Sequence, residues 1–568
     1  MTAPAPDDKW KLKPHPSIPK PDKPLLVVVL DGWGEGTHND DFNAIHKADT
    51  PCMDSLKEGA PQRWRLLKAH GTAVGLPTDD DMGNSEVGHN ALGAGQVVDQ
   101  GARLCDKALE SHRLWDLDGW KYLAPAAQAG TLHLIGLLSD GGVHSRYDQL
   151  LLLLTGAAER GAERLRVHCL TDGRDVEDGT SVQYMQRLQK DLATLREAAG
   201  VDAAIASGGG RMRVTMDRYE SDWKIVERGW DAHVLGEAPS RFTDPVEAVE
   251  KLREPKALGG KPASDQWLEP FVIVGKDDKP VGPIEDGDAV VIFNFRADRV
   301  LELSRAFEYE KFDKFERKRH PKVRFAGLMQ YDGEEKLPKH FLVPPPDIER
   351  TTGEYLARGC CVPTYACSES QKIGHVSFFW NGNRGQPFNS LETWHEVPSD
   401  KNIPFNEKPE MKSREIADLG KEALRSGKFD GGQVRLNFPN PDMVGHTGDL
   451  EATIVACTAV DKCVKELLDE VEAVGGRWLV TADHGNAEDM VQRDKKTGTP
   501  LREADGRPRP LTAHTLNPVP VVIGGPGLPD SVRFREDLPN AGLANVGPTI
   551  LNLLGYEAPP HMVPTLLA

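Results

Sequence analysis

Three apolar runs in the sequence are each followed closely by an aspartate, and this is the clearest chemical signal in the chain. The aspartates are Asp31, Asp442 and Asp483. The runs before them are Leu25–Leu30, Val434–Phe438 and Trp478–Ala482. Ligands of open α/β sheets bind beyond the carboxyl ends of the strands. A single aspartate there is usually a turn residue or a helix cap, but three together favour a metal site.

Three histidines accompany these aspartates. His446 follows Asp442 by four residues, so a helical turn would place both side chains on one face. Asp483 and His484 are adjacent, so we expect their side chains to diverge, which suits two ions or a bridged pair better than one chelated ion. His514 supplies a further imidazole. Carboxylate and imidazole ligands without thiolates suit manganese, magnesium, cobalt or zinc.

Ser85 follows a Gly-Asn turn that is typical of the start of a helix. A hydroxyl there would lie in the positive field of the helix N-terminus. A coordinated divalent ion would favour its alkoxide, which is a nucleophile for phosphoryl transfer. The plainer alternative is that Ser85 only caps the helix. His89, four residues later, is expected to pack or to support the site, and no Gly-x-Ser-x-Gly motif indicates an acyl hydrolase.

Short arginine-rich patches follow apolar runs in the middle of the chain. Guanidinium groups bind carboxylate and phosphate through paired hydrogen bonds, so such a set suits a small ligand that carries both. Each arginine taken alone is more simply a surface ion pair. Arg296 and Arg299 are the most persuasive pair, and Lys372 would add a positive charge near a transferring phosphate, although it could equally be an exposed lysine. The other patches contain His144, Arg174, Arg211, Arg213 and Arg218.

The elements that must position these residues follow an α/β pattern. Short apolar runs alternate with helical segments, which predicts parallel sheets covered by helices. Besides the three runs above, strands are predicted at Leu132–Leu138, Leu165–Leu170, Ala289–Phe293 and Val519–Ile523. Helices are predicted at Tyr147–Arg160, Ser181–Ala199, Lys412–Ser426 and Asp449–Val474.

Length and composition exclude several classes of protein. The 568 residues allow roughly two to four domains with sizeable cores. With 39% hydrophobic and 27% charged residues, the chain is neither mainly disordered nor fibrous. The net charge of −18 argues against nucleic-acid binding. The apolar runs are too short to span a membrane, and eight scattered cysteines without a CxxC pair indicate a reducing compartment.

Two breaks divide the sequence into domains. One linker is expected near 342–348, which contains three consecutive prolines, and another near 93–100. We therefore predict that a domain of residues 98–342 is inserted into an outer domain formed by 25–97 and 347–568. The N-terminal segment is rich in proline and lysine and lacks the apolar core of a signal peptide, so an arm that is flexible or lies along the surface is expected over 1–24.

Together these motifs resemble the cofactor-independent phosphoglycerate mutases, which work without 2,3-bisphosphoglycerate. The resemblance runs from about Leu25 to Leu554. It is carried by LDGWG at 30–34, GNSEVGH at 83–89, DGRD at 172–175, NFRADR at 294–299, DMVGH at 442–446 and TADHGN at 481–486. The segments 379–383 and 264–287 look closer to the plant and trypanosomatid branch. The resemblance implies an α/β fold in which an alkaline-phosphatase-like sheet domain is interrupted by a second α/β domain that binds substrate and assists phosphotransfer.

The resemblance also implies two divalent ions, often manganese, with cobalt, magnesium or zinc as alternatives. One ion would be held by Asp31, Ser85, Asp483 and His484, and the other by Asp442, His446 and His514. Ser85 would take the phosphoryl group from 3-phosphoglycerate and return it to the other hydroxyl of the trapped glycerate, while Lys372 steadies the phosphate. Substrate would be bound by His144, Arg174, Asp175, Arg211, Arg218, Arg296 and Arg299.

The implied activity is the interconversion of 3- and 2-phosphoglycerate in glycolysis and gluconeogenesis by a cytoplasmic monomer with no nucleic-acid or membrane partner. Two alternatives stay open: a related metal-dependent phosphohydrolase or phosphopentomutase, and an anion-binding protein without activity. The run at 210–213 reads Gly-Arg-Met-Arg where many relatives have a Gly-Arg-Tyr-Tyr type of sequence. Either Arg211 or Arg213 would therefore bind substrate, and Arg211 is favoured.

Overall fold

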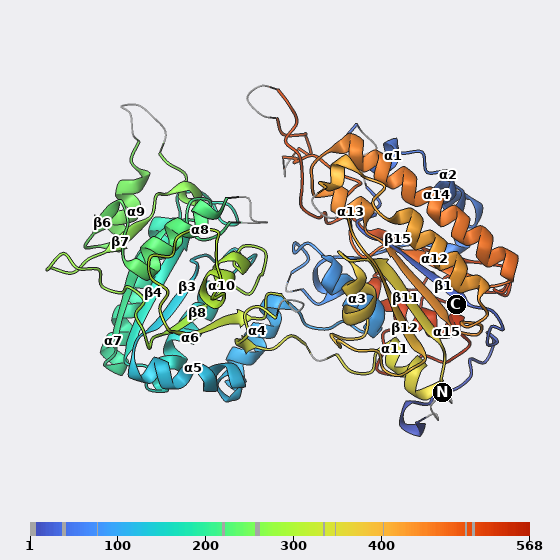
Figure 1. Ribbon diagram of the computed structural model, residues 1–568, viewed down its shortest axis with the longest axis horizontal. Coiled ribbons are helices and arrows are strands. Elements are labelled where there is room, and N and C mark those ends of the chain that lie inside the picture. The colour runs from blue at the N-terminus through green and yellow to red at the C-terminus, as the bar shows by residue number, and fades with distance from the viewer. Residues whose placement is uncertain are drawn as a thin grey trace. The chain divides into compact units, whose positions relative to one another are not determined.

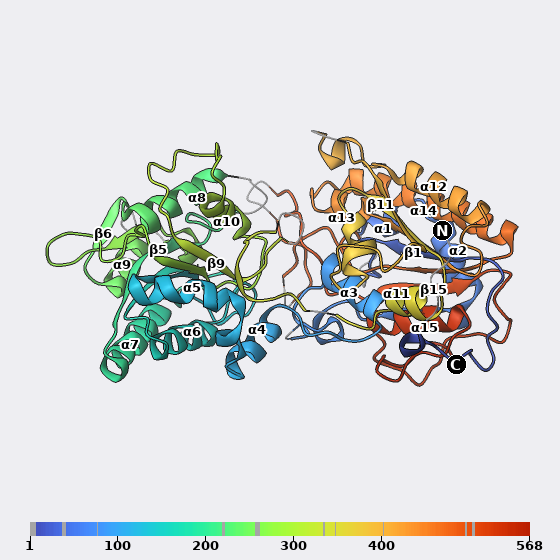
Figure 2. The same ribbon diagram turned by 60° about the horizontal axis from the view of Figure 1, so that its bottom comes forward.

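A computed structural model divides the chain into two compact units (Figures 1 and 2). Unit 1 comprises Met1–Gln100 and Pro346–Ala568, and unit 2 comprises Gly101–Pro345. The residues described are 7–36, 41–76, 78–217, 222–255, 262–332, 336–346, 348–400, 403–494, 497–502 and 506–568. Unit 2 is thus one continuous stretch, whereas unit 1 is formed by the two ends of the chain.

Unit 1 is built around a sheet whose central strands are fully buried. Across the described residues it has seven strands in the order β12-β11-β13-β1-β14-β15-β2. Their bounds are β1 Leu25–Leu30, β2 Trp64–Leu67, β11 Thr364–Glu369, β12 Glu392–Val397, β13 Gln433–Phe438, β14 Arg477–Thr481 and β15 Val519–Gly524. The strands from β12 to β14 run parallel, and the pairs β14–β15 and β15–β2 are antiparallel.

Helices cover both faces of this sheet, which is why its parallel strands are continuous apolar runs. Figures 1 and 2 show α12 and α14 on one face and α3, α11 and α15 on the other. The helices of unit 1 are α1 Ala44–Lys47, α2 Pro51–Gly59, α3 Ser85–Ala94, α11 Thr352–Glu354, α12 Ser413–Arg425, α13 Asn440–Gly445, α14 Leu450–Val474 and α15 Val546–Leu553.

Unit 2 contains a second sheet, with eight strands among the residues described. Their order is β10-β9-β8-β3-β4-β5-β7-β6, and only the β5–β7 pair is antiparallel. The bounds are β3 Leu132–Leu137, β4 Arg164–Thr171, β5 Asp202–Gly210, β6 Ser240–Phe242, β7 Phe271–Ile273, β8 Ala289–Ile292, β9 Arg324–Met329 and β10 Phe341–Val343.

The helices of unit 2 also pack on both faces of their sheet. Figures 1 and 2 show α5 and α6 on one face and α8 and α10 on the other. The bounds are α4 Gly101–Glu110, α5 Asp118–Ala129, α6 Tyr147–Glu159, α7 Ser181–Ala199, α8 Trp223–Trp230, α9 Pro245–Arg253 and α10 Leu301–Glu308. The strands and helices predicted from the sequence are all confirmed, and their ends differ by no more than one residue.

The N-terminal arm, expected to be flexible or to lie along the surface, is docked on unit 1 over residues 7–24. The side chains of Trp10 and Ile18 are buried in the core of unit 1. The backbone N–H of His15 donates to the carbonyl oxygen of Gly555 at 2.9 Å. Two large apolar side chains thus dock the segment on a surface that only the folded chain provides. Within the described residues, no helix is long and apolar enough to cross a lipid bilayer.

Candidate metal centre and active site

The carboxyl ends of three adjacent strands of unit 1 bring the predicted acidic residues together. β1 lies between β13 and β14, and the three run parallel with their last residues nearly level. Asp31 follows β1, Asp442 lies on α13 just beyond β13, and Asp483 follows β14. All three side chains are buried. The buried apolar strands therefore place three carboxylates at one edge of the sheet.

Gly32 makes this close approach possible. Its backbone has a φ of +78°, a left-handed conformation that glycine adopts without strain. A Cβ atom at this position would lie 2.8 Å from the backbone of Asp442. A larger residue would therefore push the turn after β1 away from α13.

The first group of candidate metal ligands, called here the first cluster, consists of Asp31, Asp483 and His484. Its ligand atoms lie within 4.8 Å of one another. The Nε2 atom of His484 is 3.4 Å from Asp31 Oδ1 and 3.7 Å from Asp483 Oδ2. The expectation that Asp483 and His484 diverge is therefore wrong. The chain has left the extended strand geometry at this point, so adjacent side chains no longer point to opposite faces.

The second cluster consists of Asp442, His446 and His514. The Nε2 atoms of both histidines lie 3.2 Å from Asp442 Oδ1. His446 is four residues after Asp442 at the end of α13, as the helical spacing predicts. His446 Nδ1 forms a hydrogen bond with the carbonyl oxygen of Thr512 at 2.6 Å, and His514 Nδ1 forms one with the carbonyl oxygen of Gly83 at 2.7 Å. These bonds fix each ring so that Nε2 faces the carboxylate, the usual support of a metal-binding imidazole.

Ser85 is the first residue of α3, and its hydroxyl lies beside the first cluster. The helix is capped by Asn84, whose side chain accepts from the backbone N–H of Val87 at 3.0 Å. The alternative that Ser85 is only the cap is therefore wrong. Its Oγ is 2.9 Å from His484 Nε2 and 3.3 Å from Asp31 Oδ1. The hydroxyl is buried.

Lys372 supplies the ammonium group of the site. Its Nζ donates to Ser85 Oγ at 2.5 Å, to Asp442 Oδ2 at 2.8 Å and to Asp31 Oδ1 at 3.1 Å. Burial disfavours this charge, but the two carboxylates outweigh burial and raise the pKa of Lys372 above its usual value. The lysine follows β11, next to β13 in the sheet. It is therefore a buried cation in contact with both clusters.

The histidines of the two clusters respond differently to burial. Burial lowers the pKa of His514 to about 4, with the nearby imidazole of His484 adding to the effect. Burial also acts against the charged form of His484, but the carboxylates of Asp483 and Asp442 outweigh it and raise its pKa to about 9. A neutral imidazole suits a metal ligand directly, whereas His484 would release its proton when a metal binds.

The donor set fits divalent cations. Three buried carboxylates face two cationic groups, the Lys372 ammonium and the protonated His484 imidazole, so the site carries an excess of negative charge. The Oδ2 atom of Asp483 lies 3.2 Å from His89 Nδ1, and that nitrogen is also 2.9 Å from the carbonyl oxygen of Ser85. Burying a carboxylate with few hydrogen bonds is costly, and a bound metal ion would offset that cost. Carboxylate and imidazole ligands in two clusters, beside a hydroxyl, can hold two ions and activate that hydroxyl.

A separate set of charged residues lies at the carboxyl ends of strands in unit 2. Arg211, beyond β5, is buried, and its Nη1 donates to Asp172 Oδ1 at 2.8 Å and also to Asp175. Arg213 is partly exposed and donates to Glu269 Oε1 at 2.9 Å. Of the two candidate arginines, Arg211 is thus the one that joins the strand-end residues.

His144 and two arginines lie at the neighbouring strand ends. The Nδ1 atom of His144 is 3.4 Å from Asp298 Oδ1, and Arg296 Nε is 3.2 Å from the same oxygen. The Nη1 atom of Arg299 donates to the carbonyl oxygen of Met216 at 2.9 Å. These residues follow β3, β8 and β5, which belong to one run of adjacent parallel strands.

Two predicted substrate residues stand apart from this set. The Arg174 side chain is exposed, and its backbone N–H donates to Asp172 Oδ1 at 3.1 Å in the turn after β4. Arg218 lies outside the described residues. The structure therefore gathers His144, Asp175, Arg211, Arg296 and Arg299 at one edge of the unit 2 sheet.

Comparisons with known proteins decide the family. The Metalloenzyme superfamily model matches residues 23–558. A 2,3-bisphosphoglycerate-independent phosphoglycerate mutase of Mesembryanthemum crystallinum is 62% identical over 560 residues, which is 98% of each chain. That of Trypanosoma brucei brucei is 57% identical over 560 residues, 98% of this chain and 99% of the relative. The chain belongs to the family of 2,3-bisphosphoglycerate-independent phosphoglycerate mutases.

A solved structure agrees with this assignment. The phosphoglycerate mutase of Leishmania mexicana, described at low cobalt concentration, is 54% identical. It covers 98% of this chain and 100% of its own, with a TM-score of 0.73. The predicted resemblance, the α/β fold class and the enzyme class are therefore confirmed.

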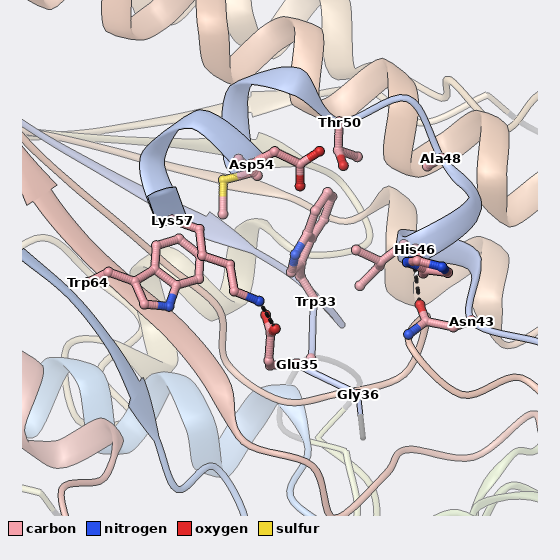
Figure 3. Close-up of a pocket in the computed structure, with 13 residues that line it drawn as sticks. Trp33, Glu35, Gly36, Asn43, His46, Ala48, Thr50, Asp54, Lys57 and Trp64 are labelled. Carbon is pink, nitrogen blue, oxygen red and sulfur yellow. Dashed lines mark hydrogen bonds and ion pairs between the residues drawn. The ribbon is translucent and has the colours of Figure 1, made fainter. Parts of the chain in front are cut away.

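A cavity lies close to the metal clusters but is not part of them. It has a volume of about 290 Å³, and its lining includes Trp33, Glu35, Lys57 and Trp64. Figure 3 shows the ammonium group of Lys57 paired with the Glu35 carboxylate beside the Trp64 ring. None of the candidate metal ligands lines this cavity. This cavity is therefore distinct from the candidate metal centre.

Sequence reasoning missed two asparagines that support the candidate site. Asn437 of β13 donates from Nδ2 to Asp31 Oδ2 at 3.0 Å, and Asn486 Nδ2 donates to Asp442 Oδ1 at 2.9 Å. His89, which the sequence predicts to pack or to support the site, has its Nδ1 atom 3.2 Å from Asp483 Oδ2. Asn437 could have been found from the sequence, because an asparagine inside an apolar strand is buried and must then form a hydrogen bond.

Proposed function

We propose that the chain interconverts 3-phosphoglycerate and 2-phosphoglycerate through a phosphoryl group carried on Ser85. One observation carries this proposal: the buried Ser85 hydroxyl lies within hydrogen-bond distance of Lys372 and His484, between two clusters of metal-ligand type. The names of the relatives support the overall reaction, and the geometry supports the serine route. We expect no 2,3-bisphosphoglycerate to be needed, because the serine itself would store the phosphoryl group.

Two divalent ions are part of this proposal. The first cluster with Ser85 would hold one, and the second cluster would hold the other. Bound there, the ions would favour the alkoxide of Ser85 and offset the charge of the phosphoryl oxygens. Manganese is the proposed native ion, with cobalt, magnesium or zinc as alternatives.

The covalent steps balance without any co-reactant. Ser85 Oγ loses its proton and forms a bond to phosphorus, the bond from phosphorus to O3 breaks, and O3 of glycerate takes up a proton in exchange. Glycerate then turns within the site, its O2 loses a proton and bonds to phosphorus, the bond from phosphorus to Oγ breaks, and Oγ regains a proton. The Lys372 ammonium, already donating to Oγ, stabilises negative charge on that oxygen and on the phosphoryl group in both halves.

Substrate binding is assigned to the charged residues at the strand ends of unit 2. Guanidinium groups suit both the carboxylate and the phosphate of a phosphoglycerate. Arg211 is preferred to Arg213 because it is buried among strand-end carboxylates, whereas Arg213 pairs with Glu269. The full proposed set is His144, Arg174, Asp175, Arg211, Arg218, Arg296 and Arg299. A cytoplasmic location and a monomeric state stay predictions.

A substrate panel with a Ser85→Ala variant tests the proposal. Purified protein loaded with manganese is expected to convert 3-phosphoglycerate and to be far less active on pentose phosphates. Ser85→Ala is expected to abolish turnover, while Ser426→Ala, an exposed serine of the same unit, keeps it. Preferred turnover of pentose phosphates, or release of inorganic phosphate as the main product, would favour the phosphopentomutase or phosphohydrolase alternative. Full activity of Ser85→Ala would refute the serine route.

A further inference from the structure

A continuous chain of buried polar side chains crosses unit 2, and the proposed mechanism does not use it. Its members lie on β3, β4 and β5, just before β8, in the π-helix 231–235 after α8, and in the segment after β5. In order they are Asp288, His133, His168, Ser207, His233 and Thr215. Successive polar atoms are 3.2, 2.9, 2.6, 2.7 and 2.8 Å apart. All six residues are buried.

The carboxylate at one end fixes the direction of the first bonds. The Oδ2 atom of Asp288 only accepts, so His133 Nε2 must donate to it. Burial opposes the charge of Asp288, but the His133 hydrogen bond and two backbone N–H groups outweigh it and lower its pKa. A neutral His133 then accepts at Nδ1, so His168 must donate from Nε2. Burial lowers the pKa of His133 and that of His168, which keeps both rings neutral.

The directions of the remaining hydrogen bonds, from His168 to Thr215, follow in the same way. His168 Nδ1 must accept, so the Ser207 hydroxyl gives its only proton to it and must itself accept from His233 Nδ1. Burial lowers the pKa of His233 to about 3, so its Nε2 carries no proton. The hydroxyl of Thr215 therefore has to donate to His233 Nε2. Every donor in this chain of side chains points toward Asp288. One arrangement of protons therefore satisfies all six side chains.

Thr215 needs such an anchor because its backbone is strained. Its φ is +67°, in the left-handed region that a β-branched residue rarely adopts. Its hydroxyl packs closely on α8, where a Cβ atom at Gly229 would lie 2.0 Å from Thr215 Oγ1. The next residue, Met216, turns its carbonyl oxygen to Arg299 Nη1 at 2.9 Å. A strained residue held by a buried network thus comes directly before a contact to a proposed substrate arginine.

We propose that this chain of side chains is a positioning device that locks Thr215 in its left-handed conformation and thereby aims the Met216 carbonyl oxygen at Arg299. The guanidinium group of Arg299 is then held in one orientation before substrate arrives. This inference rests on the proposed role of Arg299 in binding phosphoglycerate. Thr215, His233 and Ser207 act as positioning residues, since the device reaches substrate only through the arginine.

Variants at Thr215 test the device through substrate affinity. Thr215→Val keeps the shape of the side chain but removes its hydroxyl. We expect KM for 3-phosphoglycerate to rise about tenfold, because one buried hydrogen bond is lost. We expect kcat to stay within about twofold of the wild-type value. Thr215→Ser keeps the donor and is expected to restore KM. The matched control is Thr194→Val, an exposed threonine of α7, with unchanged kinetics. An unchanged KM in folded Thr215→Val, or no rescue by serine, would overturn the proposal.

A double-mutant cycle separates this inference from the proposed function. If the device acts through Arg299, Thr215→Val adds little to the KM increase caused by Arg299→Ala. Additive effects would overturn the positioning role. An unchanged KM in Arg299→Ala alone would instead contradict the substrate role of that arginine.

Two further measurements keep the test decisive if Thr215→Val does not fold. Ser207→Ala interrupts the chain at its centre and is expected to raise KM severalfold. In wild-type protein with ¹⁵N-labelled histidine, nitrogen shifts are expected to show His168 protonated at Nε2 and His233 at Nδ1, with peaks assigned by substituting each histidine. The opposite tautomers, or a normal KM in Ser207→Ala, would overturn the proposal.

Discussion

Replacing Lys372 by methionine tests whether the buried ammonium group serves both the carboxylates and the reacting oxygen. Methionine keeps most of the volume of the side chain and removes its charge. In the wild-type protein Nζ donates to Ser85, Asp442 and Asp31 at 2.5, 2.8 and 3.1 Å. The substitution therefore removes three hydrogen bonds and leaves two buried carboxylates without their cation.

The expected losses follow from these contacts. Removing one partner of a buried ion pair costs about 3–5 kcal/mol of unfolding free energy, because the remaining charge is left uncompensated. Metal ions bound to the same carboxylates would offset much of that cost, so the metal-free variant should lose more stability than the metal-loaded one. Removing one preorganised donor from a developing negative charge lowers kcat by about 10²–10³-fold.

Two assays on one preparation read out these effects. Formation of 2-phosphoglycerate is followed with enolase in excess at saturating manganese, and thermal unfolding is followed with manganese or with a chelator. The control is Lys465→Met, which removes an exposed lysine paired with Asp469 on α14. It should leave kcat unchanged and shift the unfolding temperature only slightly, because exposed ion pairs contribute little.

Two results would refute this reasoning. A kcat of Lys372→Met within threefold of the wild-type value would mean that the ammonium group does not act on the transferring phosphate. An equal loss of stability with and without metal would mean that the ions do not share the carboxylates of Asp31 and Asp442 with the lysine.

The remaining predictions concern the metal clusters and the turn beneath them. His514→Ala is expected to lower the metal content, measured by elemental analysis, from about two ions per chain to about one. The control His395→Ala, on the exposed side of β12, is expected to keep both ions. Two ions per chain in His514→Ala would contradict the assignment of a metal to the second cluster. Gly32→Ala is expected to lower the free energy of unfolding in urea by at least about 2 kcal/mol, because φ is +78° and a Cβ would meet Asp442; an unchanged denaturation midpoint would contradict this.

The parts of the fold and site that were predictable from sequence depend on local pattern. Buried parallel strands are continuous apolar runs, so their ends are visible in the sequence, and Asp31, Asp442 and Asp483 follow those ends. The spacing of Asp442 and His446 is that of one helical turn and needs no tertiary information. For such residues, the positions of strand ends and the spacing along a helix are enough to predict which side chains lie together.

The rest depends on contacts between distant segments. The docking of residues 7–24 depends on Trp10 and Ile18 finding a surface that forms only in the folded unit. The convergence of Asp483 and His484 depends on a turn whose geometry the residue types do not fix. His133, His168 and His233 are spread over a hundred positions on separate elements, so no local pattern joins them.

The most direct test of the central claim is to look for the phosphoryl group on the protein itself. Manganese-loaded enzyme would be mixed with 3-phosphoglycerate carrying a labelled phosphate, quenched in acid within milliseconds and digested for mass spectrometry. The account predicts a transient label on the peptide that contains Ser85, at up to one phosphoryl group per chain, and none in Ser85→Ala. Rapid turnover with no label on that peptide at any quench time, or a label on another residue, would contradict it.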